Sequence, residues 1–303
     1  MLKNLLFSSL VTLSSLFLAI ESSVASEHNA FKYSSSHTGS VPVEADLRYS
    51  ENDENQFLTN FKVRITREKK TIVDSALPVK LLPNYDKESG VNAIGADIKV
   101  IDLDANAEPE IVVDLTEAGA HCCSSTFIYS YDSKAKHYNV LSHLWGNYTS
   151  GYWLEEVSGK EDHRNLTDLN GDGSPEFVAL DDRFRGEFGG YAVSAAPVQI
   201  WRYSRGEMVN VTKEFPKLVY HSAADLWQMY SQIRSEYGAE SAQGAMAAYV
   251  GAKFILSQQA DAMQRLRQAY PDSRSQKFIN DLMSFLRKTG YARWLLTANP
   301  EGV

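Results

Sequence analysis

The chain has 303 residues, of which 38 are acidic and 30 are basic, so its formal net charge is −8 at neutral pH. This balance argues against a nucleic-acid-binding surface and against a polybasic membrane patch, because both need clustered Lys and Arg. The only short basic run, at 67–70, is interpreted as the solvated end of a hairpin. The length suffices for one or two domains.

The amino terminus has the order of a secretory signal peptide. Lys3 provides a short basic start, residues 5–20 form an apolar run interrupted by serines, and small residues at 23–26 offer a cleavage site. The run is too short for a convincing membrane span, and no later stretch approaches about 20 apolar residues. We therefore predict a signal peptide at 1–26, export to the periplasm or the extracellular space, and no integral membrane segment after cleavage.

The predicted mature chain begins with a leader and a β-rich domain. Residues 27–40, rich in Ser and His, are predicted to be flexible. From 41 to 215, segments such as 61–66, 125–131 and 198–203 alternate apolar and polar residues between Gly, Asp and Asn turns. Such period-2 alternation indicates antiparallel strands.

An acidic loop at 102–110 interrupts this domain. Calcium takes six to eight oxygen ligands at about 2.3–2.6 Å, and alternate positions of a bent loop can supply them. Ala107 stands where the chain must bend, and a left-handed conformation there costs about 1–2 kcal/mol. The oxygen-bearing side chains at alternate positions are Asp102, Asp104, Asn106, Glu108 and Glu110.

The same scheme recurs at 168–176, so the loop is one copy of an internal repeat. Gly173 occupies the bend in this copy and adopts a positive φ at low cost. We therefore predict that the second loop binds calcium more tightly than the first. An Asp/Asn/Gly turn that binds nothing is the alternative for both loops. The donors of the second copy would be Asp168, Asn170, Asp172, Ser174 through its carbonyl, and Glu176.

The flanks of the two loops separate two known loop types. An EF-hand needs a bidentate Glu at loop position 12 and helices on both sides, but that position holds Val113 or Ala179 inside apolar, β-prone runs. A metal loop between strands, closed by a carboxylate at position 9, resembles the FG-GAP or VCBS repeats of integrin-type β-propellers and of many exported bacterial proteins. The resemblance covers about 100–203 and implies propeller-like blades, or a related arrangement, with calcium in the loops.

The segment between the loops holds the only two cysteines, Cys122 and Cys123, directly after His121. An oxidising compartment favours a bridge, although adjacent Cα atoms lie only about 3.8 Å apart, closer than the usual 4.4–6.8 Å of a disulfide. A vicinal bridge would therefore be strained and easily reduced. Two buried thiols and a soft-metal or redox site with His121 are the other interpretations.

Aromatic residues cluster after this segment. Trp145, Tyr148, Tyr152 and Trp153 fall within nine residues that also hold two glycines. Exposed rings near amide groups suit sugar or peptide surfaces, whereas the core of a β-domain uses the same residue types. His143 could line a cleft, but a lone His is more often structural.

After Pro216 the spacing of apolar residues becomes helical, which predicts a helical region over 216–303. The first helix should end at Gly238, a second should run from Ser241 to just before Pro271, and a third should run from Asp272 to about 290. The apolar stripes of these helices are interpreted as core.

The sequence thus predicts an α+β protein, with an antiparallel β-rich domain that carries two calcium loops and a helical region after it. We interpret it as an exported, calcium-stabilised binding or scaffolding module for a protein or carbohydrate ligand. Walker, Gly-x-Ser-x-Gly and His-Glu-x-x-His motifs are absent from the sequence. The alternative is an extracytoplasmic enzyme or redox protein that uses His121, Cys122 and Cys123 or a cleft near the calcium loops, and a purely structural envelope protein is third.

Overall fold

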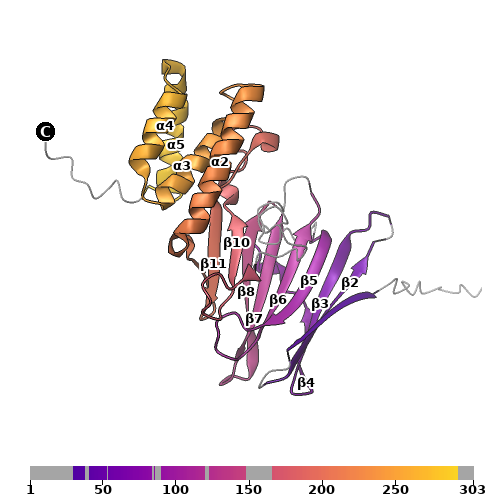
Figure 1. Cartoon of the computed structure of the whole chain (residues 1–303). Coiled ribbons are helices and arrows are strands. Elements are labelled where there is room, and N and C mark those ends of the chain that lie inside the picture. Colours follow the sequence, from indigo (N-terminus) through magenta and orange to yellow (C-terminus); the bar gives the residue numbers. More distant parts are fainter. Residues whose placement is uncertain are drawn as a thin grey trace, which may run out of the picture.

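The computed structural model describes residues 30–37, 41–52, 54–83, 85, 90–119, 123–147 and 166–292, and the predicted signal peptide lies outside these ranges. Two antiparallel sheets are followed by a C-terminal group of helices (Figure 1). The α+β class and the helical C-terminal region predicted from the sequence are confirmed.

The larger sheet has eight strands in the order β1-β2-β3-β5-β6-β7-β8, with β4 paired to β3. Its strands alternate in burial where one face meets the core. In β3, Phe61, Val63 and Ile65 are buried while Lys62 and Arg64 are exposed. The bounds are β1 (Ala30–His37), β2 (Val43–Glu51), β3 (Leu58–Arg67), β4 (Lys70–Ala76), β5 (Ala93–Ile101), β6 (Glu110–Glu117), β7 (Ser124–Asp132) and β8 (His137–Gly146).

The segment predicted to be a flexible leader contains a strand, because β1 pairs with β2 in antiparallel register. Serine side chains hold this strand on both sides. The Ser34 hydroxyl donates to Asp46 of β2 at 2.9 Å, and the Ser35 hydroxyl accepts from the amide of Val100, a residue of the later strand at 93–101, at 3.1 Å. Backbone pairing needs no apolar alternation, so the Ser-rich composition gave no strand signal.

The smaller sheet has the strand order β12-β11-β10-β9, and the two sheets differ in size. The described strands form no ring of blades, so the propeller-like arrangement implied by the resemblance is not seen. The bounds are β9 (Leu166–Thr167), β10 (Glu176–Leu180), β11 (Val198–Ser204) and β12 (Glu207–Asn210).

A shared apolar cluster joins the two sheets. Leu103, Val112 and Ile128 from the larger sheet and its loop pack with Trp145 and Phe177, and the last two rings have centroids 5.8 Å apart. β6 is therefore buried on both faces, which explains why its sequence is a continuous apolar run.

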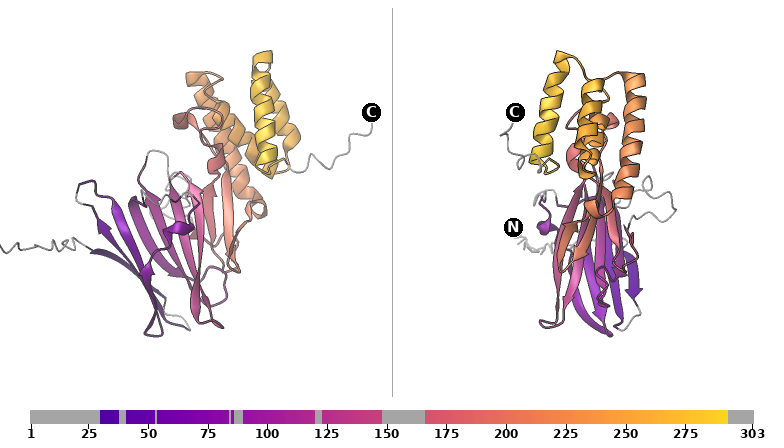
Figure 2. Two further views of the ribbon diagram at one scale, coloured as in Figure 1. Left: turned by 180° about the vertical axis from the view of Figure 1, so that it is seen from behind. Right: turned by 60° about the vertical axis from the view of Figure 1, so that its left-hand side comes forward.

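The helices gather at one end of the molecule, beyond the ends of the strands of the large sheet (Figure 2). Nearly all of α3 is buried, and at Gly251 an added Cβ would meet the ring of Phe184. Within the described part of the chain, no helix has the length and apolar character needed to span a membrane. The bounds are α2 (Pro216–Tyr237), α3 (Gln243–Ile255), α4 (Gln259–Ala269) and α5 (Gln276–Lys288).

The end of the first helix agrees with the sequence prediction, and the extent of the second helix differs from it. Gly238 caps α2 with φ of 89°, as predicted. The single helix expected from Ser241 to Pro271 is two helices, because the chain turns between α3 and α4, where Ser257 has φ of 58°. A left-handed serine interrupts the helical ladder without the Gly or Pro that signals a break.

Candidate functional site

The first acidic loop joins β5 to β6 and bends as its repeat partner does. Ala105 and Ala107 have φ of 56° and 67°, so both alanines accept the left-handed conformation. The Asp102 carboxylate holds this bend by accepting the backbone N–H groups of Asn106 at 3.2 Å and Ala107 at 2.8 Å. The alanines therefore do not prevent the loop geometry, although each left-handed residue costs about 1–2 kcal/mol.

Three carboxylates converge inside this loop. One oxygen each of Asp102, Asp104 and Glu110 lies within 4.8 Å of the others. Glu110 is only 2% exposed and accepts the Leu103 amide at 2.9 Å. One oxygen of Asp104 is buried without a hydrogen-bond partner in the described part of the chain.

The charge of this cluster is poorly solvated. Burial raises the pKa of Glu110 to about 8, and the charges of Asp104 and Asp102 add to this rise. Burial also raises the pKa of Asp104, with a further contribution from Asp102. Among the described residues, no Lys or Arg forms an ion pair with any of the three.

The remaining predicted donors of the first loop have other contacts. The Asn106 side chain accepts the Glu108 amide at 2.7 Å, which closes a local turn. Glu108 forms a two-pronged ion pair with Arg67, in which Nη2 and Oε2 are 2.6 Å apart. Arg67 is buried and lies over the Tyr131 ring, so the basic run at 67–70 is not wholly solvated, contrary to the sequence prediction.

The second loop joins β9 to β10 and satisfies its own carboxylate. Asp168 accepts the amides of Gly171 at 2.7 Å, Asp172 at 3.1 Å and Gly173 at 2.8 Å. These hydrogen bonds, that of Gly173 foremost, lower the pKa of Asp168. Gly171 and Gly173 have φ of 79° and 91°, and the positive φ of Gly173 is the one predicted at the bend.

The other predicted donors of the second loop also bond within it. Asp172 accepts the Asn170 side-chain amide and the Ser174 backbone amide, both at 2.8 Å. Asp168, Asn170 and Asp172 are exposed and do not form a buried cluster.

Glu176 marks the main difference between the copies. Like Glu110, it begins a strand, is buried and accepts an amide from the loop, here from Leu169 at 3.0 Å. Unlike Glu110, it pairs with Arg202, whose Nε and Nη2 lie 2.9 Å and 2.6 Å from Oε1. The closing glutamate of the second copy therefore has a positive partner, which Glu110 lacks among the described residues.

The two loops lie side by side. A Cβ added at Gly173 would be 3.4 Å from the Cβ of Ala105. The internal repeat of the sequence thus brings the two acidic loops next to each other.

Cys123 is buried and disulfide-bonded, and no described cysteine is free. His121 and Cys122 lie outside the described residues. A bonded Cys123 does not agree with two buried thiols or with a soft-metal site, since both need free thiols, and the redox interpretation stays a prediction.

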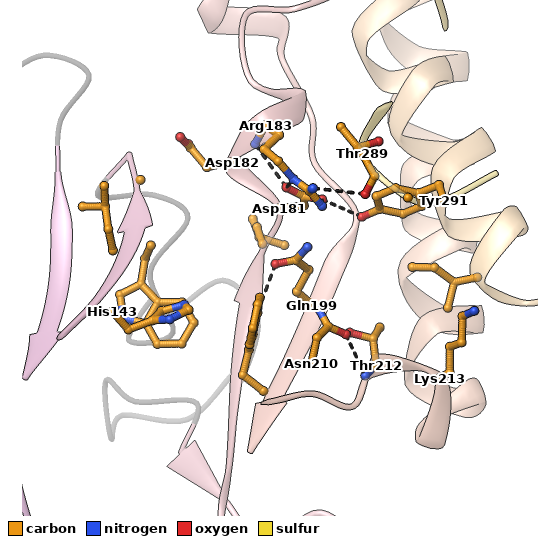
Figure 3. Close-up of a pocket in the computed structure, with 17 residues that line it drawn as sticks. His143, Asp181, Asp182, Arg183, Gln199, Asn210, Thr212, Lys213, Thr289 and Tyr291 are labelled. Atoms are coloured by element: carbon orange, nitrogen blue, oxygen red, sulfur yellow. Dashed lines mark hydrogen bonds and ion pairs between the residues drawn. The ribbon is translucent and has the colours of Figure 1, made fainter. Parts of the chain in front are cut away.

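A pocket of about 740 Å³ opens between β8, the smaller sheet and the end of α5 (Figure 3). Its first wall is aromatic. The His143 ring centroid lies 4.2 Å from that of Trp145 and 4.8 Å from that of Trp201, both in edge contacts. Burial lowers the pKa of His143 to about 4, so its imidazole is neutral near pH 7. No residue of either acidic loop lines the pocket.

The opposite wall is a polar network that joins the smaller sheet to the helices. The buried Asp181 accepts from the Arg183 side chain at 2.8 Å and 2.6 Å and from the Tyr291 hydroxyl at 2.7 Å. Arg183 also donates to the Thr289 carbonyl at 3.1 Å. Burial raises the pKa of Tyr291 well above its ordinary value, and the charge of Asp181 adds to this effect.

The base of the pocket fixes two further side chains. The Trp201 indole donates to the Gln199 side chain at 3.0 Å, which sets the plane of its ring. The Asn210 carbonyl oxygen accepts from the Thr212 hydroxyl at 2.7 Å and from its amide at 3.2 Å.

The close approach of β8 to the smaller sheet depends on Gly146. It has φ of 92°, and a Cβ there would overlap the side chain of Asp182 in the 3-10 helix η3 (Asp182–Phe184).

Sequence reasoning found only part of this pocket. His143 and Trp145 were candidates, while Tyr148, Tyr152 and Trp153 lie outside the described residues. The polar network was missed, because its members come from segments up to 110 positions apart. The Trp-bearing strand at 198–203 was the available signal, and it was interpreted only as a strand. The missed lining residues include Asp181, Arg183, Gln199, Trp201, Asn210 and Tyr291.

The chain is similar to two bacterial proteins over part of its length. It is 27% identical over 175 residues to a probable thylakoid lumen protein of Synechocystis sp., a match that covers 57% of this chain and 48% of that protein. It is 24% identical over 177 residues to an uncharacterized protein of Sinorhizobium fredii, covering 58% and 25% of the two chains. The matches thus span about half or less of these relatives, and no family model or solved structure matches the chain significantly.

Proposed function

We propose that the protein is an extracytoplasmic binding or scaffolding module whose fold is stabilised by calcium in the first acidic loop. The observation that supports this proposal is the convergence of Asp102, Asp104 and Glu110 within 4.8 Å. Glu110 is almost fully buried, and no ion pair among the described residues offsets the cluster. A divalent cation would supply the missing charge.

The donor set suits calcium. Carboxylate and carbonyl oxygens are hard ligands, and calcium tolerates the irregular geometry of a loop, whereas magnesium demands near-ideal octahedral coordination. Burying several carboxylates without a counter-charge is costly. The binding free energy would therefore appear as stability of the native state.

We place the cation in the first loop rather than the second, which reverses the order expected from the glycines. Arg202 already neutralises Glu176, whereas Glu110 has no such ion pair among the described residues. A cation in the second loop would have to compete with Arg202. The loop amides do not distinguish the copies, because Asp102 and Asp168 both accept them. The proposal keeps the FG-GAP or VCBS type of loop, in which a closing Glu begins the next strand, and sets it on an open pair of sheets.

A location outside the cytoplasm is supported by the predicted signal peptide and by the Synechocystis relative, which is named a probable thylakoid lumen protein. Extracellular calcium modules work with dissociation constants of about 10⁻⁴–10⁻³ M. A loop with three carboxylates is therefore sufficient in such a compartment.

Calorimetry tests the proposal. Calcium at a hundredfold excess over its dissociation constant should stabilise the protein by about 2.7 kcal/mol, chelator should lower the melting temperature, and magnesium should restore it poorly. Isothermal titration should show calcium binding lost in Asp104→Asn and kept in the matched variant Asp172→Asn. A melting curve unchanged by chelator would refute calcium stabilisation, and a greater loss in Asp172→Asn would place the cation in the second loop.

A further inference from the structure

We propose that the pocket between β8, the smaller sheet and the C-terminal helices binds a neutral saccharide. This inference deepens the proposed binding role, but it uses residues separate from the acidic loops. It rests on the size of the pocket, the chemistry of its two walls and the balance of its charges.

The cavity has the dimensions and the position of a ligand site. Its volume of about 740 Å³ falls within the range of about 300–1,000 Å³ typical of small-molecule sites, which form preferentially where structural units meet. Three units supply its walls, namely the end of the larger sheet, the smaller sheet and the turn after α5 (Figure 3).

The aromatic wall offers apolar ring surface to a ligand. Trp201 and His143 are neither fully buried nor fully exposed, while Trp145, which contacts the His143 ring, is buried. The Trp145 indole is held by the Thr126 hydroxyl at 2.8 Å, and the Trp201 indole by Gln199. Rings fixed in this way can stack against the C–H face of a sugar ring with little loss of side-chain entropy.

Two groups on the pocket lining retain hydrogen-bonding capacity. Within the described residues, neither the His143 ring nitrogens nor the Asn210 side-chain nitrogen has a hydrogen-bond partner. The neutral imidazole offers one donor and one acceptor, and the amide nitrogen offers two donors. Sugar hydroxyls both donate and accept, so they match this mixed set better than an acceptor-only anion does.

Among the described residues, the charged groups that line the pocket balance one another. Two carboxylates, Asp181 and Asp182, line it together with two cations, Arg183 and Lys213. Both oxygens of Asp181 are already engaged by Arg183 and Tyr291, so this network positions the wall rather than presenting a free charge. A described lining without net charge gives no electrostatic preference for an ion, which favours a neutral ligand.

The experiment titrates the full mature protein with neutral trisaccharides of glucose, galactose, mannose or N-acetylglucosamine, with trigalacturonate as the anionic counterpart. Tryptophan fluorescence and isothermal titration report binding. At least one neutral trisaccharide should bind and change the fluorescence. Asn210→Ala and His143→Ala should each weaken that affinity at least tenfold, whereas the matched variant Asn139→Ala, at the far end of β8, should leave it unchanged.

Three outcomes would overturn the inference. The first is that no neutral trisaccharide binds at about 10 mM, a concentration at which even a Kd of 1 mM would give near saturation. The second is that trigalacturonate binds as tightly as the neutral sugars or more tightly. The third is that Asn139→Ala loses as much affinity as the pocket variants. Asn210 is exposed, so its variant should fold even if the His143 variant does not. Melting curves without sugar test the calcium proposal separately. If the protein binds saccharide but chelator does not change its melting curve, only the calcium proposal is refuted.

Discussion

Replacing Glu110 by Gln tests the carboxylate cluster directly, because the change removes the charge and keeps the shape of the side chain. Burial raises the pKa of Glu110 from 4.5 to about 8. Between these values the folded state without calcium binds about one more proton here than the unfolded state. The stabilising contribution is thus fully present below pH 4.5 and is lost as the pH rises through 8.

The expected magnitude follows from this difference in proton binding. One proton changes the free energy of unfolding by about 1.4 kcal/mol per pH unit. From pH 5.5 to 7.5, Glu110 should therefore cost the calcium-free wild type about 2–3 kcal/mol. The variant Glu110→Gln should lack this slope and should be more stable than the wild type at pH 7.5 in chelator.

Urea unfolding in chelator at pH 5.5 and 7.5 measures both free energies. The exposed variant Asp172→Asn is the control and should keep the wild-type slope. His143 titrates in the opposite sense below pH 6.5, because its pKa is lowered, but it is present in all three proteins and cancels in the comparison. Equal pH slopes for wild type and Glu110→Gln would refute the argument from a buried, uncompensated carboxylate.

Three further outcomes are expected. Ala107→Gly should stabilise the protein by up to about 1 kcal/mol in urea unfolding. The change removes the strain of an alanine in the left-handed conformation, and the greater entropy of glycine in the unfolded chain offsets part of this gain. Destabilisation would contradict this account. In the same assay, Gly146→Ala should destabilise the protein by more than about 2 kcal/mol, because its Cβ would overlap a neighbouring carboxylate. The control Gly206→Ala meets no atom within 4 Å and should cost only its left-handed strain of about 1–2 kcal/mol. Equal losses would exclude the overlap as the cause. The intact mass of protein isolated without reductant should be two hydrogen atoms lower than that of the dithiol, because Cys122 and Cys123 form a bridge. This bridge should be reduced faster in chelator, and recovery of two free thiols after denaturing alkylation would contradict the prediction.

The sequence by itself determined the features that depend on near neighbours. Period-2 alternation predicted strands that the structure contains, such as β3, β7 and β11, and helical spacing with Gly238 predicted the end of α2. The repeat of the two acidic loops could also be predicted from the sequence, because the turn hydrogen bonds of Asp102 and Asp168 reach only a few residues along the chain. Local backbone geometry is encoded locally, and therefore it could be predicted.

Tertiary structure alone decided which closing glutamate lacks a counter-charge among the described residues and where a pocket forms. Arg202 neutralises Glu176 across 26 positions of sequence, and Arg67 reaches Glu108 across 41. The network at the pocket joins Asp181 to a tyrosine 110 positions away. Whether a buried carboxylate keeps its charge depends on side chains that only the packing of the sheets and helices brings within hydrogen-bonding distance. That packing cannot be predicted from the spacing or the composition of the loops.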